Sequence, residues 1–202
     1  LRIGLATPAW PGTATPNGIA SATAQLAAGL QAIGQEVTIL AVDIDAAHDH
    51  PRVIALPPGR MSLLQRLRFR LAPDVVIRQL MLDRFIAGAR RAVAEQAIDV
   101  LMIEESFGWA GALRRLLPIP VVVTLHGPHW LHRVRPGKPG PGPDARREAW
   151  EAAGLRQIDG IISPSRDVLE RTRAEWGLPD VPTAVIGNPV RIAPLTEPAA
   201  AN

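Results

Sequence analysis

The 202-residue sequence contains no cysteine and a single lysine, Lys138, and it has no long apolar run. Without cysteine the chain can form no disulfide, no thiolate zinc site and no cysteine nucleophile. No apolar run approaches the roughly 20 residues that a membrane-spanning helix requires. Aromatic residues make up only 4% of the chain and are not interleaved with the arginines, which argues against binding of single-stranded nucleic acid.

Arginine supplies nearly all of the positive charge, which gives a formal net charge of +3 and a pI of about 10.8. Hydrophobic residues make up 47% and charged residues 20% of the sequence, a balance typical of a globular domain. The absence of cysteine fits a reducing compartment, so we expect a cytoplasmic protein. From the aromatic content described above, we expect no nucleic-acid partner. Because the sequence starts at Leu1 without a methionine, we also expect one piece of a longer protein.

Short apolar segments alternate along the chain with segments of helical periodicity. Several of the short segments are continuously apolar, which indicates parallel strands covered on both faces. The alternation predicts an α/β domain with a doubly wound, mostly parallel sheet built from right-handed βαβ units. The predicted strands are Ile3–Ala6, Val37–Val42, Val53–Leu56, Val100–Ile103, Val121–Leu125, Gly160–Ser163 and Ala184–Ile186.

Apolar stripes and end signals predict three helices. The first ends before Gly34, a typical C-terminal glycine, and the second begins at Pro73. The third runs from an N-cap at Ser165 to about Trp176. The stripes of the first two are Ile19, Thr23, Leu26, Leu30 and Ile33, and Val75, Leu82, Ile86, Ala89 and Val93.

Two stretches interrupt this alternation. Residues 127–144 are rich in proline and glycine and are predicted to form an exposed loop. Residues 187–202 show no periodicity and are predicted to be an interdomain linker or tail. We therefore expect residues 1–186 to form a single Rossmann-like domain whose C-terminal partner domain is absent.

Ligands of such sheets bind beyond the carboxyl ends of the strands, so the residues after each strand are the candidates. The first strand is followed by a long loop that ends in Asn17-Gly18 and opens into the first helix. This loop has neither a G-x-G-x-x-G pattern nor a Walker lysine. Bare N–H groups at a helix start beside a glycine suit a phosphate group, although a plain asparagine cap explains the same residues equally well.

Glu104 and Glu105 follow the fourth strand, where they could bind hydroxyl groups, accept a proton or simply be solvated. Adjacent side chains of an extended chain point in opposite directions, so we expect one of the two to face the cleft. His126 and Gly127 follow the fifth strand and are also expected at the cleft. Although three histidines recur at a spacing of three from His126, no carboxylate or cysteine lies close by, which argues against a metal site.

The segment Arg60–Arg70 is basic and amphipathic, with leucines at positions 63, 64, 67 and 71 on one face flanked by arginines. Together with Arg84 and Arg91, it could contact anionic lipid at the inner face of a membrane. The interpretation that we favour is a helix packed on the domain with solvated arginines.

Four segments, taken in order, resemble family 4 glycosyltransferases. The first is residues 1–43, with a strand, Thr-Pro, a Pro/Gly loop, Asn-Gly-Ile and later G-Q-E-V-T-I-L. The others read V-V-V-T-L-H-G-P-H-W at 121–130, D-G-I-I-S-P-S-R-D-V at 159–168 and V-I-G-N-P-V at 185–190. The last sits where these enzymes cross to their second domain, although the usual N-G-V-D is absent. Each motif alone is loose, but four in order are fairly specific.

The resemblance implies the N-terminal, acceptor-side half of a GT-B enzyme that transfers a sugar from a nucleotide-sugar donor with retention of configuration. It implies that the backbone at Asn17 and Gly18 approaches the donor diphosphate and that His126 contacts the donor sugar. No metal or other cofactor is expected. The family's nucleotide pocket and E-x7-E motif belong to a C-terminal domain, the expected partner of this one, so we expect this piece alone to be inactive. The candidates for contacts with the sugar or with a sugar, lipid or small-molecule acceptor are Glu104, Glu105, Gly127 and Ser165.

Two other interpretations stay open. The chain could be a non-catalytic Rossmann-like binding module in which the glycine and the histidine are structural. It could also belong to a GT-B enzyme of another kind, such as an epimerase or an inverting transferase. A second α/β unit with paired glutamates beyond Asn202 would favour the enzyme.

Overall fold

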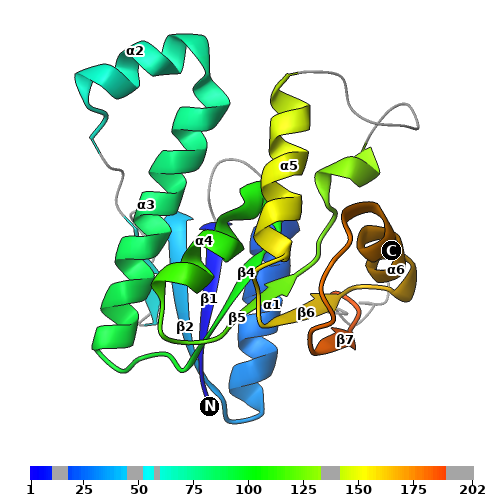
Figure 1. Ribbon diagram of the computed structural model, residues 1–202. Helices are drawn as coiled ribbons and strands as arrows, with labels where there is room; N and C mark the ends of the chain where they lie inside the picture. Colours follow the sequence, from blue (N-terminus) through cyan, green and yellow to red (C-terminus); the bar gives the residue numbers. More distant parts are fainter. Residues whose placement is uncertain (11–17, 45–51, 57–59, 133–141, 190–202) are drawn as a thin grey trace, which may run out of the picture.

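The computed structural model describes residues 1–10, 18–44, 52–56, 60–132 and 142–189; Asn17 lies outside this part. Within it, seven parallel strands form one sheet in the order β3-β2-β1-β4-β5-β6-β7 (Figure 1). All seven predicted strands and the doubly wound α/β class are confirmed. The strands are β1 (Arg2–Ala9), β2 (Glu36–Asp43), β3 (Val53–Ala55), β4 (Val100–Glu104), β5 (Val121–Thr124), β6 (Gly160–Ser163) and β7 (Thr183–Val185).

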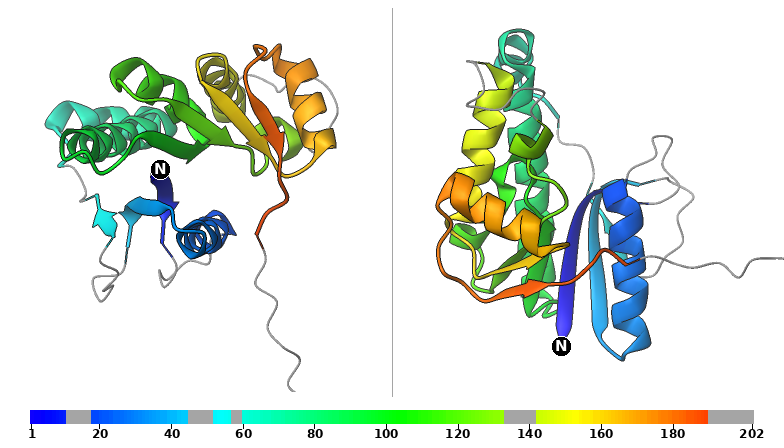
Figure 2. Two further views of the ribbon diagram at one scale, coloured as in Figure 1. Left: turned by 90° about the horizontal axis from the view of Figure 1, so that it is seen from below. Right: turned by 90° about the vertical axis from the view of Figure 1, so that its right-hand side faces the viewer.

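Helices cover both faces of the sheet (Figure 2). One face carries α1, which packs on β1 and β2, and the other carries α3, α4 and α5. Each face has its own buried cluster, centred on Leu5 and Ile39 beneath α1 and on Phe85 and Leu113 beneath the other helices. The helices are α1 (Gly18–Ala32), α2 (Leu63–Leu71), α3 (Pro73–Ala94), α4 (Trp109–Leu116), α5 (Pro143–Leu155) and α6 (Arg166–Trp176), with short 3-10 helices η1 (Ser106–Gly108) and η2 (His129–His132).

The end signals of the predicted helices are confirmed. The α1 helix ends before Gly34, whose φ of 79° is favourable for glycine and rare for other residues. The α3 helix begins at Pro73. The Ser165 hydroxyl accepts a hydrogen bond from the Val168 amide at 3.2 Å and so caps α6. None of the described helices is long and apolar enough to span a membrane.

Three sequence predictions are wrong in detail. Ile33 is 71% exposed, because α1 ends one residue earlier and the chain turns away from the sheet. The first turn of α3 buries Val76 rather than Val75, because packing on the sheet sets the rotation of the helix. The stretch 127–144 is not one loop: it contains η2, and Pro143 occupies the first turn of α5.

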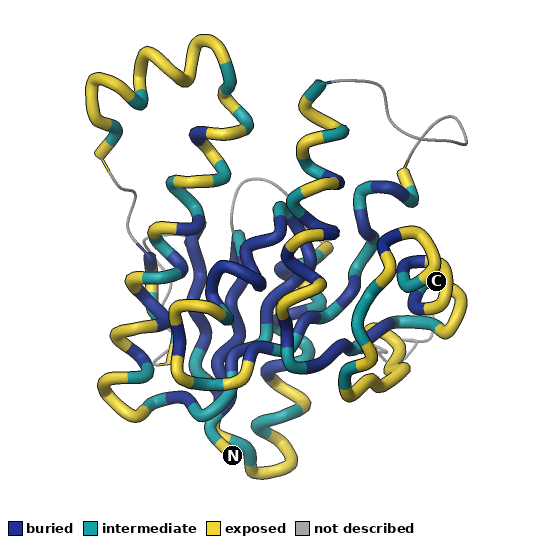
Figure 3. The backbone as a smooth tube through the Cα atoms, in the orientation of Figure 1, coloured by how far each residue is buried: buried dark blue, intermediate teal, exposed yellow. Residues whose placement is uncertain are grey.

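The prediction that the basic segment packs on the domain is also wrong. The α2 helix buries none of its nine residues (Figure 3), and its leucines are exposed. Its start is fixed locally instead: the Ser62 hydroxyl accepts from the Gln65 amide at 3.2 Å, and the Gln65 side chain accepts from the Ser62 amide at 2.8 Å. This capping box stabilises the helix without burial.

Three glycines bring α5 into direct backbone contact with η1 and α4. A Cβ atom on Gly154 would lie 2.6 Å from the Gly108 Cα, and one on Gly111 would lie 2.8 Å from the Gly154 carbonyl oxygen. Gly108 itself has a φ of 64°, and a Cβ there would overlap the Trp150 carbonyl. Only glycine permits this approach, which holds α5 against the carboxyl end of β4.

We predict that Gly154→Ala destabilises the fold by more than about 2 kcal/mol, because the added methyl group meets backbone atoms that cannot move aside. The matched control is Gly29→Ala in α1, where a Cβ meets nothing within 4 Å and alanine favours the helix by up to about 1 kcal/mol. Urea unfolding of both variants tests this. Equal stability of the two variants would contradict the close packing of α5.

Candidate functional site

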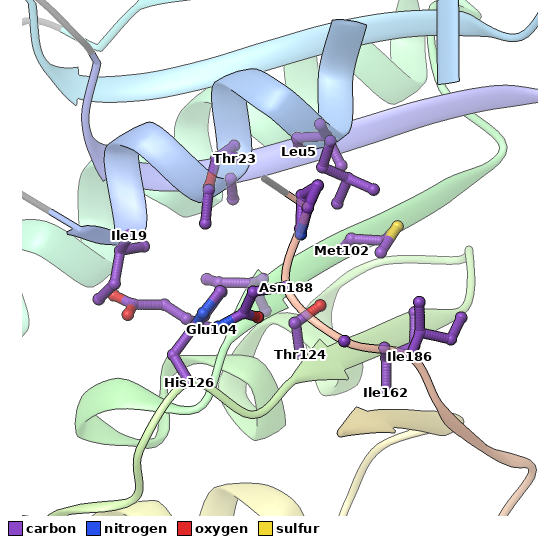
Figure 4. Close-up of a pocket in the computed structure, with 16 residues that line it drawn as sticks. Leu5, Ile19, Thr23, Met102, Glu104, Thr124, His126, Ile162, Ile186 and Asn188 are labelled. Atoms are coloured by element: carbon purple, nitrogen blue, oxygen red, sulfur yellow. The ribbon is translucent and has the colours of Figure 1, made fainter. Parts of the chain in front are cut away.

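A small cavity of about 80 Å³, open to solvent, lies beside α1 at the carboxyl end of the sheet (Figure 4). Its base consists of side chains from the central strands, among them Met102 of β4 and Ile162 of β6. One wall is the first half of α1, and the opposite side is closed by the segment that follows β7. Glu104, His126 and Asn188 lie together at its polar end, with Ile19 nearby (Figure 4).

Glu104 is the last residue of β4 and is only 4% exposed. Burial and the neighbouring Glu105 carboxylate raise its pKa to about 8, although the Ser106 hydroxyl donates to Oε2 at 3.1 Å. At neutral pH Glu104 is therefore a protonated carboxylic acid. In this state it can both donate and accept hydrogen bonds, as recognition of a neutral hydroxyl group requires.

His126 follows β5 by two residues and is half-buried. Burial lowers the pKa of its imidazole, so the ring is neutral at neutral pH. The two titratable side chains on the cavity are thus both uncharged near pH 7. None of the described lining residues is arginine or lysine. The cavity consequently suits a neutral, hydroxyl-bearing group better than an ion.

Glu105 points away from this cavity and holds the chain that carries His126. Its carboxylate accepts hydrogen bonds from the backbone amides of His126 at 2.9 Å and Gly127 at 2.8 Å. Burial raises the pKa of Glu105 to about 7, and these two amides oppose the rise. Of the adjacent pair, Glu105 therefore loses its proton first, and above about pH 7 it is the ionised acceptor for the loop.

A second buried carboxylate, Glu151 of α5, holds the same loop from its other end. Glu151 accepts from the His129 amide at 2.8 Å and from the Phe107 amide at 3.3 Å. It also forms an ion pair with Arg147 at 2.8 Å, and the Arg147 guanidinium lies over the Phe107 ring at 4.4 Å. Residues 126–129 are thus fixed by two buried carboxylates, which we call the carboxylate clamp.

The clamp depends on an unusual turn between β4 and α4. Phe107 has a φ of 55°, a left-handed conformation that costs a bulky residue on the order of 1–2 kcal/mol. Three interactions offset this cost: the Glu151 contact, a 2.8 Å hydrogen bond from Arg78 Nε to the Phe107 carbonyl, and stacking of Phe107 on Trp109. The turn reverses the chain directly after Glu104 and Glu105. The Glu104 side chain faces the cavity, and the Glu105 side chain faces the amides of His126 and Gly127.

The structure brings together part of the predicted site. Glu104 and His126 line the cavity, and Gly18 begins α1 at its rim, where an added Cβ would meet nothing within 4 Å. Glu105, Gly127 and Ser165 are not among the described lining residues: Glu105 binds backbone amides and Ser165 caps α6.

Sequence reasoning missed several lining residues. The sequence places Asn188 in the linker, at the expected crossover to a second domain, and nothing in its neighbours indicates that the chain folds back over the sheet after β7. Thr23 had been placed on a core stripe of α1, although it also faces the cavity. Thr124 is the last residue of β5 and lies two residues before His126. It could have been found by including the last residue of each strand among the candidates.

No group of three or more histidine or carboxylate side chains is arranged to hold a metal ion within the described residues. The three histidines of the 126–132 stretch separate instead. The His129 ring lies 3.1 Å from Asp144, His126 lines the cavity, and His132 is exposed on η2.

Comparisons with known proteins were made against families and solved structures. Residues 17–189 match the family model described as Glycosyl transferase 4-like domain. No curated protein matches the chain. Sucrose-phosphate synthase from Thermosynechococcus elongatus is a similar structure, with a TM-score of 0.63 and 17% identity over 92% of this chain and 47% of that chain.

Two plant structures have the same fold. A variant of Os79 from O. sativa in complex with UDP has a TM-score of 0.61 and 14% identity, covering 95% of this chain and 53% of that one. Medicago truncatula UGT71G1 complexed with UDP-glucose has a TM-score of 0.57 and 12% identity, covering 94% and 52%. At these identities the likeness concerns the fold alone, and the chain spans about half the length of each of these three structures.

We predict that the free energy of unfolding falls as the pH rises from about 6.5 to 8.5. The pKa values of Glu104 and Glu105 are raised in the folded state, so folding holds protons that the unfolded chain has already released. The lowered pKa of His126 acts in the opposite direction, and it stops contributing above about pH 7.5, where the unfolded imidazole has also lost its proton. Glu104 alone should account for about 2 kcal/mol of the loss.

Urea unfolding at the two pH values measures this change. Glu104→Gln should remove most of the pH dependence, whereas the exposed control Glu36→Gln should leave it unchanged. Stability that stays constant or increases over this range in the wild-type chain would show that Glu104 is ionised in the folded state.

The clamp makes a separate prediction. Glu105→Ala should destabilise the fold by about 2–4 kcal/mol, because two buried amides lose a charged acceptor. Amide hydrogen exchange should then quicken at His126 and Gly127 more than at Val123 in the middle of β5, which serves as the internal control. Unchanged protection at the two loop amides would mean that Glu105 does not hold them.

Proposed function

The chain belongs to the glycosyl transferase 4-like family, and from this membership we propose that it is the N-terminal, acceptor-side half of a retaining glycosyltransferase. In this proposal the complete enzyme transfers a sugar from a nucleotide-sugar donor to a sugar, lipid or small-molecule acceptor. The observation that carries the proposal is the placement of Glu104, His126 and the start of α1 around one cavity at the carboxyl end of the sheet.

The start of α1 supports a donor with a diphosphate group. The N-terminal end of a helix carries a partial positive charge from the helix dipole, which favours an anion by roughly 0.3–1 kcal/mol. Gly18 is exposed and leaves open space, so a phosphate can approach the backbone. UDP and UDP-glucose are named in two of the similar structures, which is why we propose a nucleotide-sugar.

The polar end of the cavity supports binding of the donor sugar. A neutral His126 can donate or accept one hydrogen bond at the reacting sugar, and a protonated Glu104 can do the same beside it. A protonated Glu104 cannot abstract a proton, and the lowered pKa of His126 makes its neutral imidazole a weaker base than a free one, so both are suited to orienting hydroxyls. In this proposal His126 positions the sugar while positive charge develops on the sugar ring.

The cavity alone cannot neutralise the leaving diphosphate. No arginine or lysine is found among its described lining residues, and one helix start offsets only a fraction of the charge. We therefore propose that basic side chains on a second domain complete the site and that no metal is needed. The coverage of about half of each similar structure fits such a division.

We predict that His126→Ala lowers kcat/KM for sugar transfer on the order of 100-fold or more in the longest natural protein that contains this chain. The matched control is His132→Ala, an exposed histidine six residues on. A screen of nucleotide-sugars and acceptors, with the anomeric configuration of the product determined by NMR, provides the measurement. The 202-residue chain alone should give no product.

The outcomes separate the alternatives. An inverted product would exclude the retaining mechanism, and an epimerised nucleotide-sugar would indicate the other kind of GT-B enzyme. Nucleotide-sugar binding without any turnover in the longer protein would favour a non-catalytic binding module. Full activity of His126→Ala, or turnover by the 202-residue chain, would refute the proposed division of the site.

A further inference from the structure

The exposed apolar side chains gather around α2. The described part of the chain exposes twelve large hydrophobic side chains, and seven of them lie between residues 63 and 77. Scattered exposed leucines are ordinary on a protein surface, but a contiguous group indicates a binding surface. By helical spacing Leu63, Leu64, Leu67 and Leu71 share one face of α2, and we call this face the α2 surface.

The α2 helix is formed without the burial that normally stabilises an amphipathic helix. Leu63 is 83% exposed and Leu71 is 85% exposed, and no residue of the helix is buried. The Ser62–Gln65 capping box fixes its start, and Arg68 and Arg70 in the last turn interact favourably with the helix dipole. The apolar face is therefore preformed and available to a partner.

The charge of the segment that carries this face has one sign, although Asp83 of α3 lines a cavity together with Arg60 and Gln65. Residues 60–73 contain four arginines, Arg60, Arg66, Arg68 and Arg70, and no aspartate or glutamate. The next acidic residue, Asp74, is paired with Arg146 at 2.9 Å and so does not neutralise them. By the helical spacing, Arg68 and Arg70 flank the leucine stripe on its two sides.

The position of α2 leaves the surface accessible. The helix projects beyond the body of the domain at the end where the strands terminate and the cavity lies (Figures 1 and 3). An apolar stripe with arginine on both sides is typical of a helix that lies in a membrane interface. Its leucines then lie among the acyl chains and its arginines at the phosphate groups.

We propose that the α2 surface docks the domain peripherally on a membrane that contains anionic phospholipids. A second copy of the chain is a poorer occupant, because a symmetric contact would place four arginines against four arginines. An anionic lipid surface satisfies both features at once, with apolar burial for the leucines and electrostatic attraction for the arginines near the headgroups.

The test is co-sedimentation of the 202-residue chain with vesicles of phosphatidylcholine alone or mixed with phosphatidylglycerol. The chain should bind the mixed vesicles at low salt and bind neither the phosphatidylcholine vesicles nor the mixed vesicles at high salt. The combined substitution of Arg66, Arg68 and Arg70 by Gln should weaken binding by about 100-fold. Leu63→Ser with Leu67→Ser should weaken it by about tenfold or more.

Matched controls keep the test specific. Replacing Arg90, Arg166 and Arg171 by Gln removes the same charge elsewhere, and Ile33→Ser changes an exposed apolar residue on α1. Both controls should bind like the wild-type chain, and the thermal midpoints of the two α2 variants should stay near the wild-type value because their side chains are exposed. Absence of binding to the mixed vesicles, or equal loss in the control variants, would overturn the proposal. The proposal would also be overturned if sedimentation velocity without vesicles showed a dimer and Leu63→Ser abolished that dimer.

Discussion

The contact on which the candidate site depends is the pair of hydrogen bonds that the Glu105 carboxylate accepts from the amides of His126 and Gly127. A loop after a parallel strand has no ladder partner for its amides, so its conformation must be fixed from elsewhere. Glu105 provides this at one end and Glu151 at the other. Glu151 can reach the loop only because the glycine contact with Gly154 brings α5 close.

The two adjacent glutamates have different roles because their environments differ. Glu105 meets backbone amides that favour its ionised form, whereas Glu104 faces the cavity with one hydroxyl as its hydrogen-bond donor. Between about pH 7 and pH 8 the result is a charged group that supports the loop and a neutral group that faces the cavity. With a neutral His126 beside it, this end of the cavity is polar but uncharged, which is suited to a sugar, while the start of α1 offers a helix end at the rim for phosphate.

Much of the fold could be predicted because the strands are continuous apolar runs and α1, α3 and α6 have clear end signals. The α5 helix could not, because Pro143 at its first turn follows a stretch whose composition is that of a loop. The role of Glu105 could not either: alternation along the strand separates it from Glu104, but its amide partners come from a loop 21 and 22 residues later. The exposure of α2 depends on what packs against it, which the amphipathic pattern does not specify.

The central claim is that the cavity between α1 and the His126 loop holds the sugar of a nucleotide-sugar donor. A crystal structure of the longest natural protein that contains this chain, in complex with a nucleotide-sugar that it binds, tests it most directly. We predict the diphosphate at the first amides of α1 and the sugar within hydrogen-bonding distance of His126 and Glu104. A donor bound elsewhere, with the cavity filled by protein side chains, would contradict the account.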